Sequence, residues 1–90
     1  MYINFLKNIA FTKLIKTDDR LREFNFRKLP DAQQQGVFHV DVSDDRGNRI
    51  VFHMKKESAA DQWKISTTNV PQWIQNAEAK LHEQIEIELQ

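Results

Sequence analysis

The chain has 90 residues, enough for one domain with a single modest hydrophobic core. Hydrophobic residues make up 40% of it and charged residues 29%, a balance typical of a globular protein rather than a disordered one. Its 13 basic and 13 acidic residues cancel, so no overall field would draw it to nucleic acid, and the absence of cysteine excludes disulfides, thiolate nucleophiles and cysteine zinc sites.

Residues 1–17, MYINFLKNIAFTKLIKT, mix bulky apolar residues with polar ones. The interruptions lead us to expect neither a signal peptide nor a membrane span, which needs about 20 apolar residues. Apolar residues recur at helical spacing at Ile3, Leu6, Ala10 and Leu14. We therefore favour an N-terminal helix. A strand over residues 8–16 is the alternative, because Ile9, Phe11 and Ile15 break a narrow helical face.

The next segment, REFNFRK at residues 22–28, alternates between apolar and polar residues. This pattern predicts a strand with Phe24 and Phe26 facing the core. Pro30 and Gly36 then bound a loop, PDAQQQG.

A hairpin is predicted over residues 38–54. The DRG sequence at 45–47 suits a three-residue turn with Gly47 in the left-handed conformation. That turn fixes the register, which pairs Val42 with Ile50, Val40 with Phe52, and Phe38 with Met54. One face of the hairpin is then wholly apolar, and the opposite face carries His39, Asp41, Arg49 and His53.

A further strand is expected at residues 62–67, QWKIST, with Trp63 and Ile65 facing inward. A four-residue loop at 58–61 would pair Lys56 with Trp63.

The C-terminal segment, residues 70–89, is predicted to be one helix with Pro71 in its first turn. Its apolar stripe consists of Ile74, Ala77, Leu81 and Ile85. The predicted fold is a single α+β domain over residues 1–90 with two layers. It contains a four-stranded antiparallel meander and, on its apolar face, the C-terminal and N-terminal helices, in the order α-β-β-β-β-α.

The best candidate for chemistry is the pair His39 and His53, which the register places directly opposite each other with Asp41 beside them. Two imidazoles and a carboxylate can bind zinc or a similar ion. An open sheet surface, however, offers no supporting shell, so solvated histidines are the favoured interpretation. Because opposed imidazoles disfavour double protonation, a response to pH is a further alternative.

Catalytic patterns are weak in this sequence. The serines lie outside any nucleophile-elbow motif, the Asp44–Asp45 pair belongs in a turn, and the two glycines form no phosphate-binding loop. We therefore expect no enzyme activity, no cofactor and no metal.

Association with a partner is the favoured function. The two edge strands of the meander would carry unpaired backbone groups, so either a homodimer or a protein partner could pair there. Nucleic-acid binding by a basic face of the sheet is the alternative, although the strand aromatics are predicted to point inward. The candidate binding residues are Arg22, Arg27, Arg49, Lys55, Lys64 and Trp73. A small accessory protein of bacterial type in the cytoplasm is the expected setting.

Overall fold

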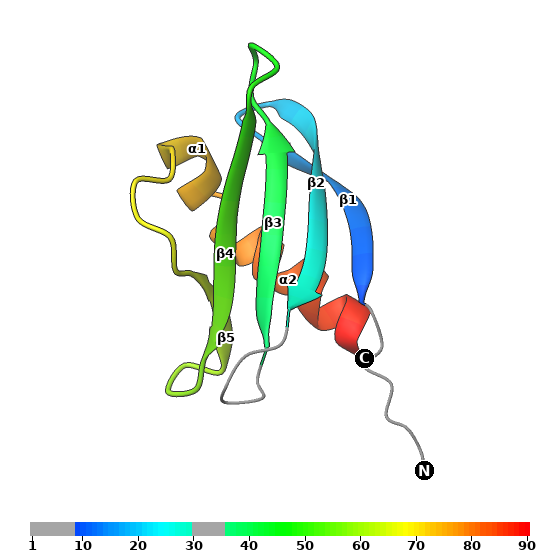
Figure 1. The fold of residues 1–90 in the computed structure, drawn as a ribbon, viewed down its shortest axis with the longest axis vertical. Coiled ribbons are helices and arrows are strands. Elements are labelled where there is room, and N and C mark those ends of the chain that lie inside the picture. Colours follow the sequence, from blue (N-terminus) through cyan, green and yellow to red (C-terminus); the bar gives the residue numbers. More distant parts are fainter. Residues whose placement is uncertain (1–8, 30–35) are drawn as a thin grey trace.

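The structure is a computed structural model that describes residues 9–29 and 36–90. Its order of elements is five strands followed by two helices: β1 (Ala10–Thr17), β2 (Arg20–Leu29), β3 (Val37–Ser43), β4 (Arg49–Glu57), β5 (Gln62–Ile65), α1 (Gln72–Gln75) and α2 (Glu78–Leu89). The strands form one antiparallel sheet in sequence order, β1-β2-β3-β4-β5 (Figure 1). The expected α+β class and antiparallel meander are therefore present.

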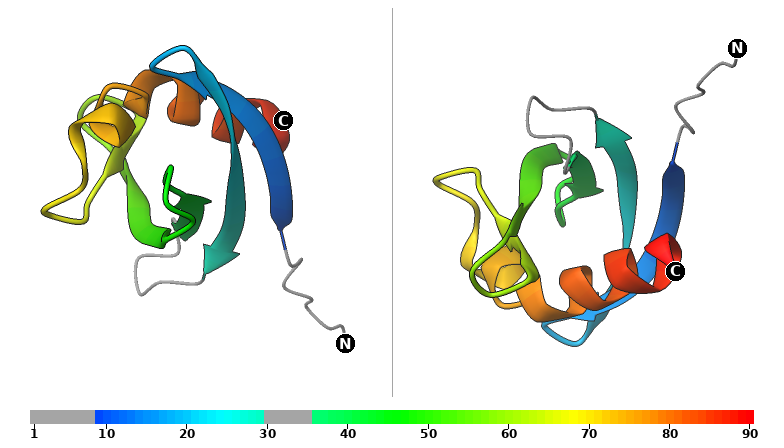
Figure 2. Two further views of the ribbon diagram at one scale, coloured as in Figure 1. Left: turned by 90° about the horizontal axis from the view of Figure 1, so that it is seen from above. Right: turned by 90° about the horizontal axis from the view of Figure 1, so that it is seen from below.

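The sheet curls strongly, and α2 lies across the opening that the curl leaves between β5 and β1 (Figure 2). The space enclosed by the curl holds the core. The buried apolar residues of the strands are Ile15, Phe24, Phe26, Phe38, Val40, Val42, Phe52, Met54 and Trp63. Against them pack Ile74, Ala77, Leu81 and Ile85, which form the predicted apolar stripe. Alternating faces of the strands thus produce a dry inner face and a wet outer face.

The registers of the central strands are those that the sequence predicts. Val40 pairs with Phe52, His39 with His53, and Lys56 with Trp63. The turn after β3 closes with a bond from the Gly47 N–H to the Asp44 carbonyl (3.0 Å), and Gly47 has φ +82. The positive φ explains why glycine suits this position.

The prediction of an N-terminal helix is wrong for residues 10–17, which form β1; Ile3 and Leu6 lie outside the described residues. A strand is favoured over a helix here because pairing with β2 places Phe11 and Ile15 on the inner face of the sheet. There Phe11 stacks on Phe26, with ring centroids 4.6 Å apart. A turn of two aspartates, Asp18 and Asp19, joins the strands, both at positive φ. The meander therefore has five strands, and the predicted four-strand count is wrong.

The C-terminal segment is two helices rather than one. The chain bends at Asn76 and Ala77, where the Ala77 N–H bonds to the Ile74 carbonyl at 2.9 Å. α1 is a single short turn, and α2 runs from the β5 side to the β1 side of the molecule (Figure 1). Within residues 9–29 and 36–90, no helix is long and apolar enough to cross a membrane.

Polar side chains of α2 cover the edge of β5. The Trp63 N–H donates to His82 Nδ1 at 3.0 Å, and the Ile65 N–H donates to Glu78 Oε2 at 2.8 Å. These two donors would otherwise face outward unpaired. The expectation that this last strand offers a free edge is therefore wrong, because the helix supplies acceptors at four-residue spacing along one flank.

The opposite flank of α2 reaches β1 through long side chains. Lys80 Nζ donates to the Lys16 carbonyl at 2.9 Å, and Lys13 forms an ion pair with Glu88 at 3.1 Å. A basic side chain of β1 thus pairs with an acidic side chain near the end of α2. Lys13 lies on the inner face of β1, so the C-terminal turn of α2 sits on that side of the strand.

Candidate functional site

The outer face of the sheet holds most of the predicted candidates. We use this name for the exposed side of β1–β4, which carries Thr12, Leu14, Leu21, Asn25, Arg27, His39, Asp41, Arg49, Val51, His53 and Lys55. An open hollow of about 530 Å³ lies over its centre, lined by both polar and apolar side chains.

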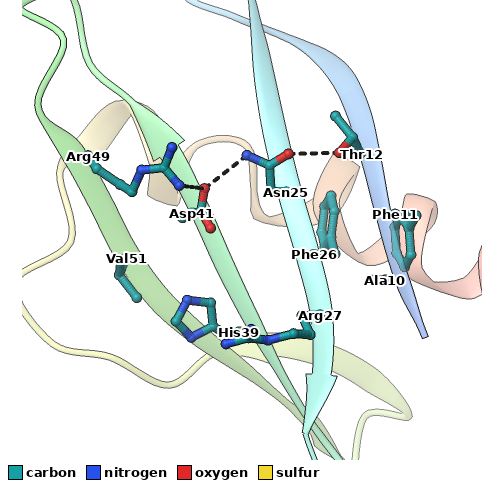
Figure 3. A pocket seen from close by; sticks show the side chains of 10 residues that line it. All are labelled: Ala10, Phe11, Thr12, Asn25, Phe26, Arg27, His39, Asp41, Arg49 and Val51. Carbon is teal, nitrogen blue, oxygen red and sulfur yellow. Dashed lines mark hydrogen bonds and ion pairs between the residues drawn. The ribbon is translucent and has the colours of Figure 1, made fainter. Parts of the chain in front are cut away.

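A chain of hydrogen bonds crosses four strands in this hollow (Figure 3). Thr12 Oγ1 donates to Asn25 Oδ1 at 2.7 Å, and Asn25 Nδ2 donates to Asp41 Oδ1 at 2.9 Å. Arg49 Nη1 completes the chain with an ion pair to the same Asp41 oxygen at 3.0 Å. Asp41 is therefore held by an amide and a guanidinium, and its side chain is only 14% exposed.

The histidine pair forms as predicted, with ring centroids 5.4 Å apart and a tilt of 54°. Asp41 does not join it, because that carboxylate is turned toward Arg49 and Asn25. Among the residues that the structure describes, no group of three or more histidine, cysteine, aspartate or glutamate side chains could hold a metal ion. His39 and His53 therefore lack Asp41 as the third ligand that the metal hypothesis needs.

His39 lies in a mainly cationic setting. Arg27 is its neighbour on β2 (Figure 3). His53 is its neighbour on β4. Burial lowers the pKa of His39 below its ordinary value of 6.5, and the charges of Arg27 and His53 lower it further, while Asp41 opposes them. This imidazole therefore favours its neutral form more than a free histidine does.

The predicted basic residues divide into two groups. Arg27 and Lys55 are exposed on the outer face, and neither has an acidic partner among the described residues. Arg49 is committed to Asp41, and Lys64 lies 3.8 Å from Glu78 of α2. The basic surface is therefore smaller than the sequence indicates.

Arg22 and Trp73 lie together, but they are not on the outer face. The Arg22 guanidinium carbon is 4.1 Å from the Trp73 ring centroid. Arg22 also donates to Thr17 Oγ1 at 2.9 Å and pairs with Asp45 at 2.9 Å, and its side chain is 10% exposed. These contacts form a clamp between β2, the turn after β3 and α1, and the binding role of Arg22 and Trp73 stays a prediction.

The edge of β1 differs from that of β5. The bond from the Lys28 N–H to the Ile9 carbonyl (2.9 Å) shows which residues of β1 form backbone hydrogen bonds with β2. In an antiparallel pair, the backbone groups of every second residue point toward the neighbouring strand. Odd-numbered residues of β1 bond to β2, and even-numbered ones face away. Of the edge-facing backbone groups that the structure describes from Ala10 to Lys16, only the Lys16 carbonyl has a partner.

Exposed apolar side chains lie on the β1–β2 hairpin and at the end of α2. Leu14 and Leu21 are 67% and 66% exposed on the outer side of the β1–β2 hairpin. Ile87 and Leu89, which flank the Glu88 that contacts Lys13, are 56% and 38% exposed. The remaining large apolar side chain that is exposed in the described residues is Val51. Large exposed apolar groups that cluster usually mark a contact surface.

Sequence reasoning missed this surface because a helix was favoured for residues 1–17. The strand alternative contained the necessary signal, since alternation from Phe11 inward puts Leu14 outward. Comparisons of the chain with protein-family models, with curated proteins and with solved structures find no match.

Proposed function

We propose that this protein is a small, non-enzymatic protein-interaction module, and that its partner adds a strand to the exposed edge of β1. The observation that supports the proposal most directly is the difference between the two edges of the sheet. α2 supplies acceptors to β5, whereas the edge-facing donors and acceptors from Ala10 to Leu14 have no partner in the part of the chain that the structure describes. Strand addition uses such groups for affinity.

The apolar side chains around the edge support the same proposal. A strand that lies beside β1 would present one row of side chains to Leu14, while Leu21 lies one strand further from the edge, on β2. The other row would point to the inner side, where α2 ends with Ile87, Glu88 and Leu89. Burying these groups would add a hydrophobic contribution of about 25 cal/mol per Å² of apolar surface removed from water.

Binding is also a better use of the polar groups than catalysis. His82 accepts the Trp63 N–H, and Asp41 is held by Asn25 and Arg49, so neither is placed to transfer a proton to a substrate. His39 and His53 stand on an open surface, whereas catalytic sites usually lie in enclosing clefts.

Site-specific photo-cross-linking in cells of the organism from which the protein comes tests this proposal. A photoreactive amino acid at Leu14 should give a covalent adduct with another polypeptide chain. The same group at Val51 is the matched control, because Val51 is exposed but lies on β4, away from the edge. Equal adducts at both positions, or none at Leu14, would overturn the proposal.

Nucleic-acid binding is the second candidate, and the exposed cations Arg27 and Lys55, which have no acidic partner within residues 9–29 and 36–90, favour it. They share the outer face with His39 and His53, so phosphates could be contacted there. The aromatic residues of the strands argue against stacking of bases, because Phe24, Phe38 and Trp63 are buried. Titration of labelled RNA at two salt concentrations is the test. Phosphate contact predicts salt-dependent affinity that Arg27→Gln weakens and Val51→Thr leaves unchanged.

A further inference from the structure

Four nitrogen-bearing side chains lie next to one another on the outer face, near the end of β2. Arg27 of β2 is the direct partner of His39 on β3, and His39 is the direct partner of His53 on β4. Lys55 follows His53 by two residues on β4, so its side chain lies on the same face. Neighbouring strands are about 4.8 Å apart, which places the first three residues in a row about 10 Å long. We call Arg27, His39, His53 and Lys55 the cationic cluster.

The side chains of this cluster lie close together and are accessible from solvent. Arg27 points across the sheet toward His39, and both line the hollow over the outer face (Figure 3). The rings of His39 and His53 have centroids 5.4 Å apart. Arg27 and Lys55 are exposed and the two histidines are half-buried, so a ligand in solvent can reach the whole cluster.

The positive charge of the cluster is not compensated by ion pairs in the part of the chain that the structure describes. Within residues 9–29 and 36–90, neither Arg27 nor Lys55 forms an ion pair. Asp41, the nearest acidic residue on β3, is already paired with Arg49 at 3.0 Å. Glu57, the last residue of β4, is the nearest acidic residue on that strand. The cluster therefore attracts an anion from solution.

The hydrogen-bonding groups of the cluster suit a doubly charged oxyanion. A guanidinium and an ammonium carry only donors, and an imidazole carries one donor when it is neutral and two when it is protonated. Charge-assisted bonds to phosphate oxygens are stronger than neutral hydrogen bonds, and the guanidinium fork matches two such oxygens at once. A phosphate group offers several acceptor oxygens and up to two negative charges, so it can bond to donors from three strands together.

The protonation of His39 depends on the electrostatic field of the cluster. Burial lowers the pKa of His39, the charges of Arg27 and His53 lower it further, and Asp41 raises it. The charged and titratable groups around this imidazole are Arg27 from β2, His53 and Lys55 from β4, and Asp41 on its own strand with its partner Arg49. A bound anion favours the protonated imidazole and so raises the pKa of His39. By linkage, the anion then binds more tightly as the pH falls.

We propose that the cationic cluster binds a phosphate group that carries two negative charges, as in inorganic phosphate or a phosphate monoester, with uptake of a proton by His39. The donors stand on three paired strands, so the sheet holds them in place before the ligand arrives. The site uses side chains of β2, β3 and β4, and it does not depend on strand addition at the edge of β1.

An NMR titration of the full chain with sodium sulfate tests the inference, with the ionic strength held constant by sodium chloride. Sulfate has the tetrahedral shape of phosphate and keeps both charges from acidic to basic pH, so any pH dependence comes from the protein. We expect saturable shifts of the His39 and His53 ring signals. His82, which lies between α2 and β5, is the internal control and should not respond to sulfate. Binding should be at least about fivefold tighter at about pH 5 than at about pH 8.

Variants separate a defined site from general attraction by charge. Arg27→Gln should weaken sulfate binding about fivefold or more, because it removes the guanidinium fork. Arg46→Gln is the matched control, since it removes the same charge from the exposed turn after β3 and should bind like the wild type. Lys55→Gln removes a donor on a different strand and should also weaken binding. His39→Gln keeps an N–H donor but cannot titrate, so it should retain most of the affinity at about pH 8 and lose most of the pH dependence.

Three results would overturn the inference. The first is that neither sulfate nor inorganic phosphate shifts the His39 and His53 signals to saturation. The second is equal weakening in Arg27→Gln and Arg46→Gln, and the third is an affinity that does not increase as the pH falls. Single-stranded RNA without terminal phosphates is the comparison ligand, because each of its phosphates carries one charge. If this RNA shifts the cluster and sulfate does not, the inference fails and the nucleic-acid candidate stands. Cross-links from Leu14 test the β1 edge separately, so failure at the cluster leaves that proposal intact.

Discussion

Glu78 offers the sharpest test of how α2 closes the sheet. Its carboxylate accepts the Ile65 N–H at 2.8 Å at the otherwise free edge of β5, and it also lies 3.8 Å from Lys64 Nζ. Glu78→Ala removes the acceptor and leaves a half-buried backbone donor without a partner. Glu78→Gln keeps an acceptor oxygen at the same place. Glu83→Ala, on the exposed side of the same helix, is the control.

The expected magnitude follows from the contacts. A hydrogen bond to a charged group contributes about 1.5–3 kcal/mol, and the partly exposed Glu78 belongs at the lower end. The long ion pair with Lys64 and the position in the first helical turn each add less than about 1 kcal/mol. Glu78→Ala should therefore lower the free energy of unfolding by about 2 kcal/mol, Glu78→Gln by about 1 kcal/mol, and Glu83→Ala by less than about 0.5 kcal/mol.

Urea denaturation measures these differences, with equal m-values as the condition for comparing midpoints. A loss of about 2 kcal/mol is a large part of the total stability of a small domain. Amide hydrogen exchange adds a local measurement, because the Ile65 N–H should lose protection in Glu78→Ala and retain most of it in Glu78→Gln. If Glu78→Ala unfolds like Glu83→Ala and the Ile65 amide exchanges unchanged, the helix does not cap the edge and the reasoning is refuted.

Three further predictions concern other parts of the molecule. Asp19 has φ +66 in a two-residue turn, so Asp19→Gly should raise the free energy of unfolding by about 0.5–1 kcal/mol. Asp19→Ala should lower the free energy of unfolding, and thermal or urea melts that show the opposite order would contradict this. The hydrogen bond from Lys56, with a further one from Trp63, holds the pKa of Glu86 below 4.5. The stabilisation of the fold by ionised Glu86 is therefore present above pH 4.5 and is lost as the pH falls through the lowered pKa. In Glu86→Gln this part of the acid dependence should vanish from melts recorded at different pH. Because Arg27 and His53 both lower the pKa of His39, Arg27→Gln and His53→Gln should each raise it toward 6.5 in an NMR titration, with the larger effect from Arg27; no change in either variant would show that burial alone sets the value.

Predictability differed sharply between the centre and the start of the chain. The hairpin of β3 and β4 was predictable because one glycine turn and strict alternation leave a single register that buries Phe38, Val40 and Phe52 together. The start was ambiguous because the apolar residues at 9–15 fit two periods. Pairing with β2 decided between them, and that pairing is a long-range contact with no local signature.

The candidate site was predictable only in part. The opposition of His39 and His53 follows from the register alone, and the structure contains it. The capture of Asp41 by Arg49 and Asn25 does not, because which neighbour a side chain contacts depends on three strands at once. The same is true of Arg22, whose clamp with Trp73 joins β2 to a helix far along the chain.

The sequence by itself determined which side chains are dry. Alternation along the strands and the stripe of Ile74, Ala77, Leu81 and Ile85 specify the core without reference to any partner, because the period of the backbone sets the face on which each residue lies. Tertiary structure alone decided how the edges of the sheet are covered. The curl of the sheet brings α2 against both edges, and polar side chains of α2 cover β5 but, among the described residues, bond to only one backbone group at the edge of β1. Edge protection depends on distances between segments that are remote in sequence, and no local pattern encodes those distances.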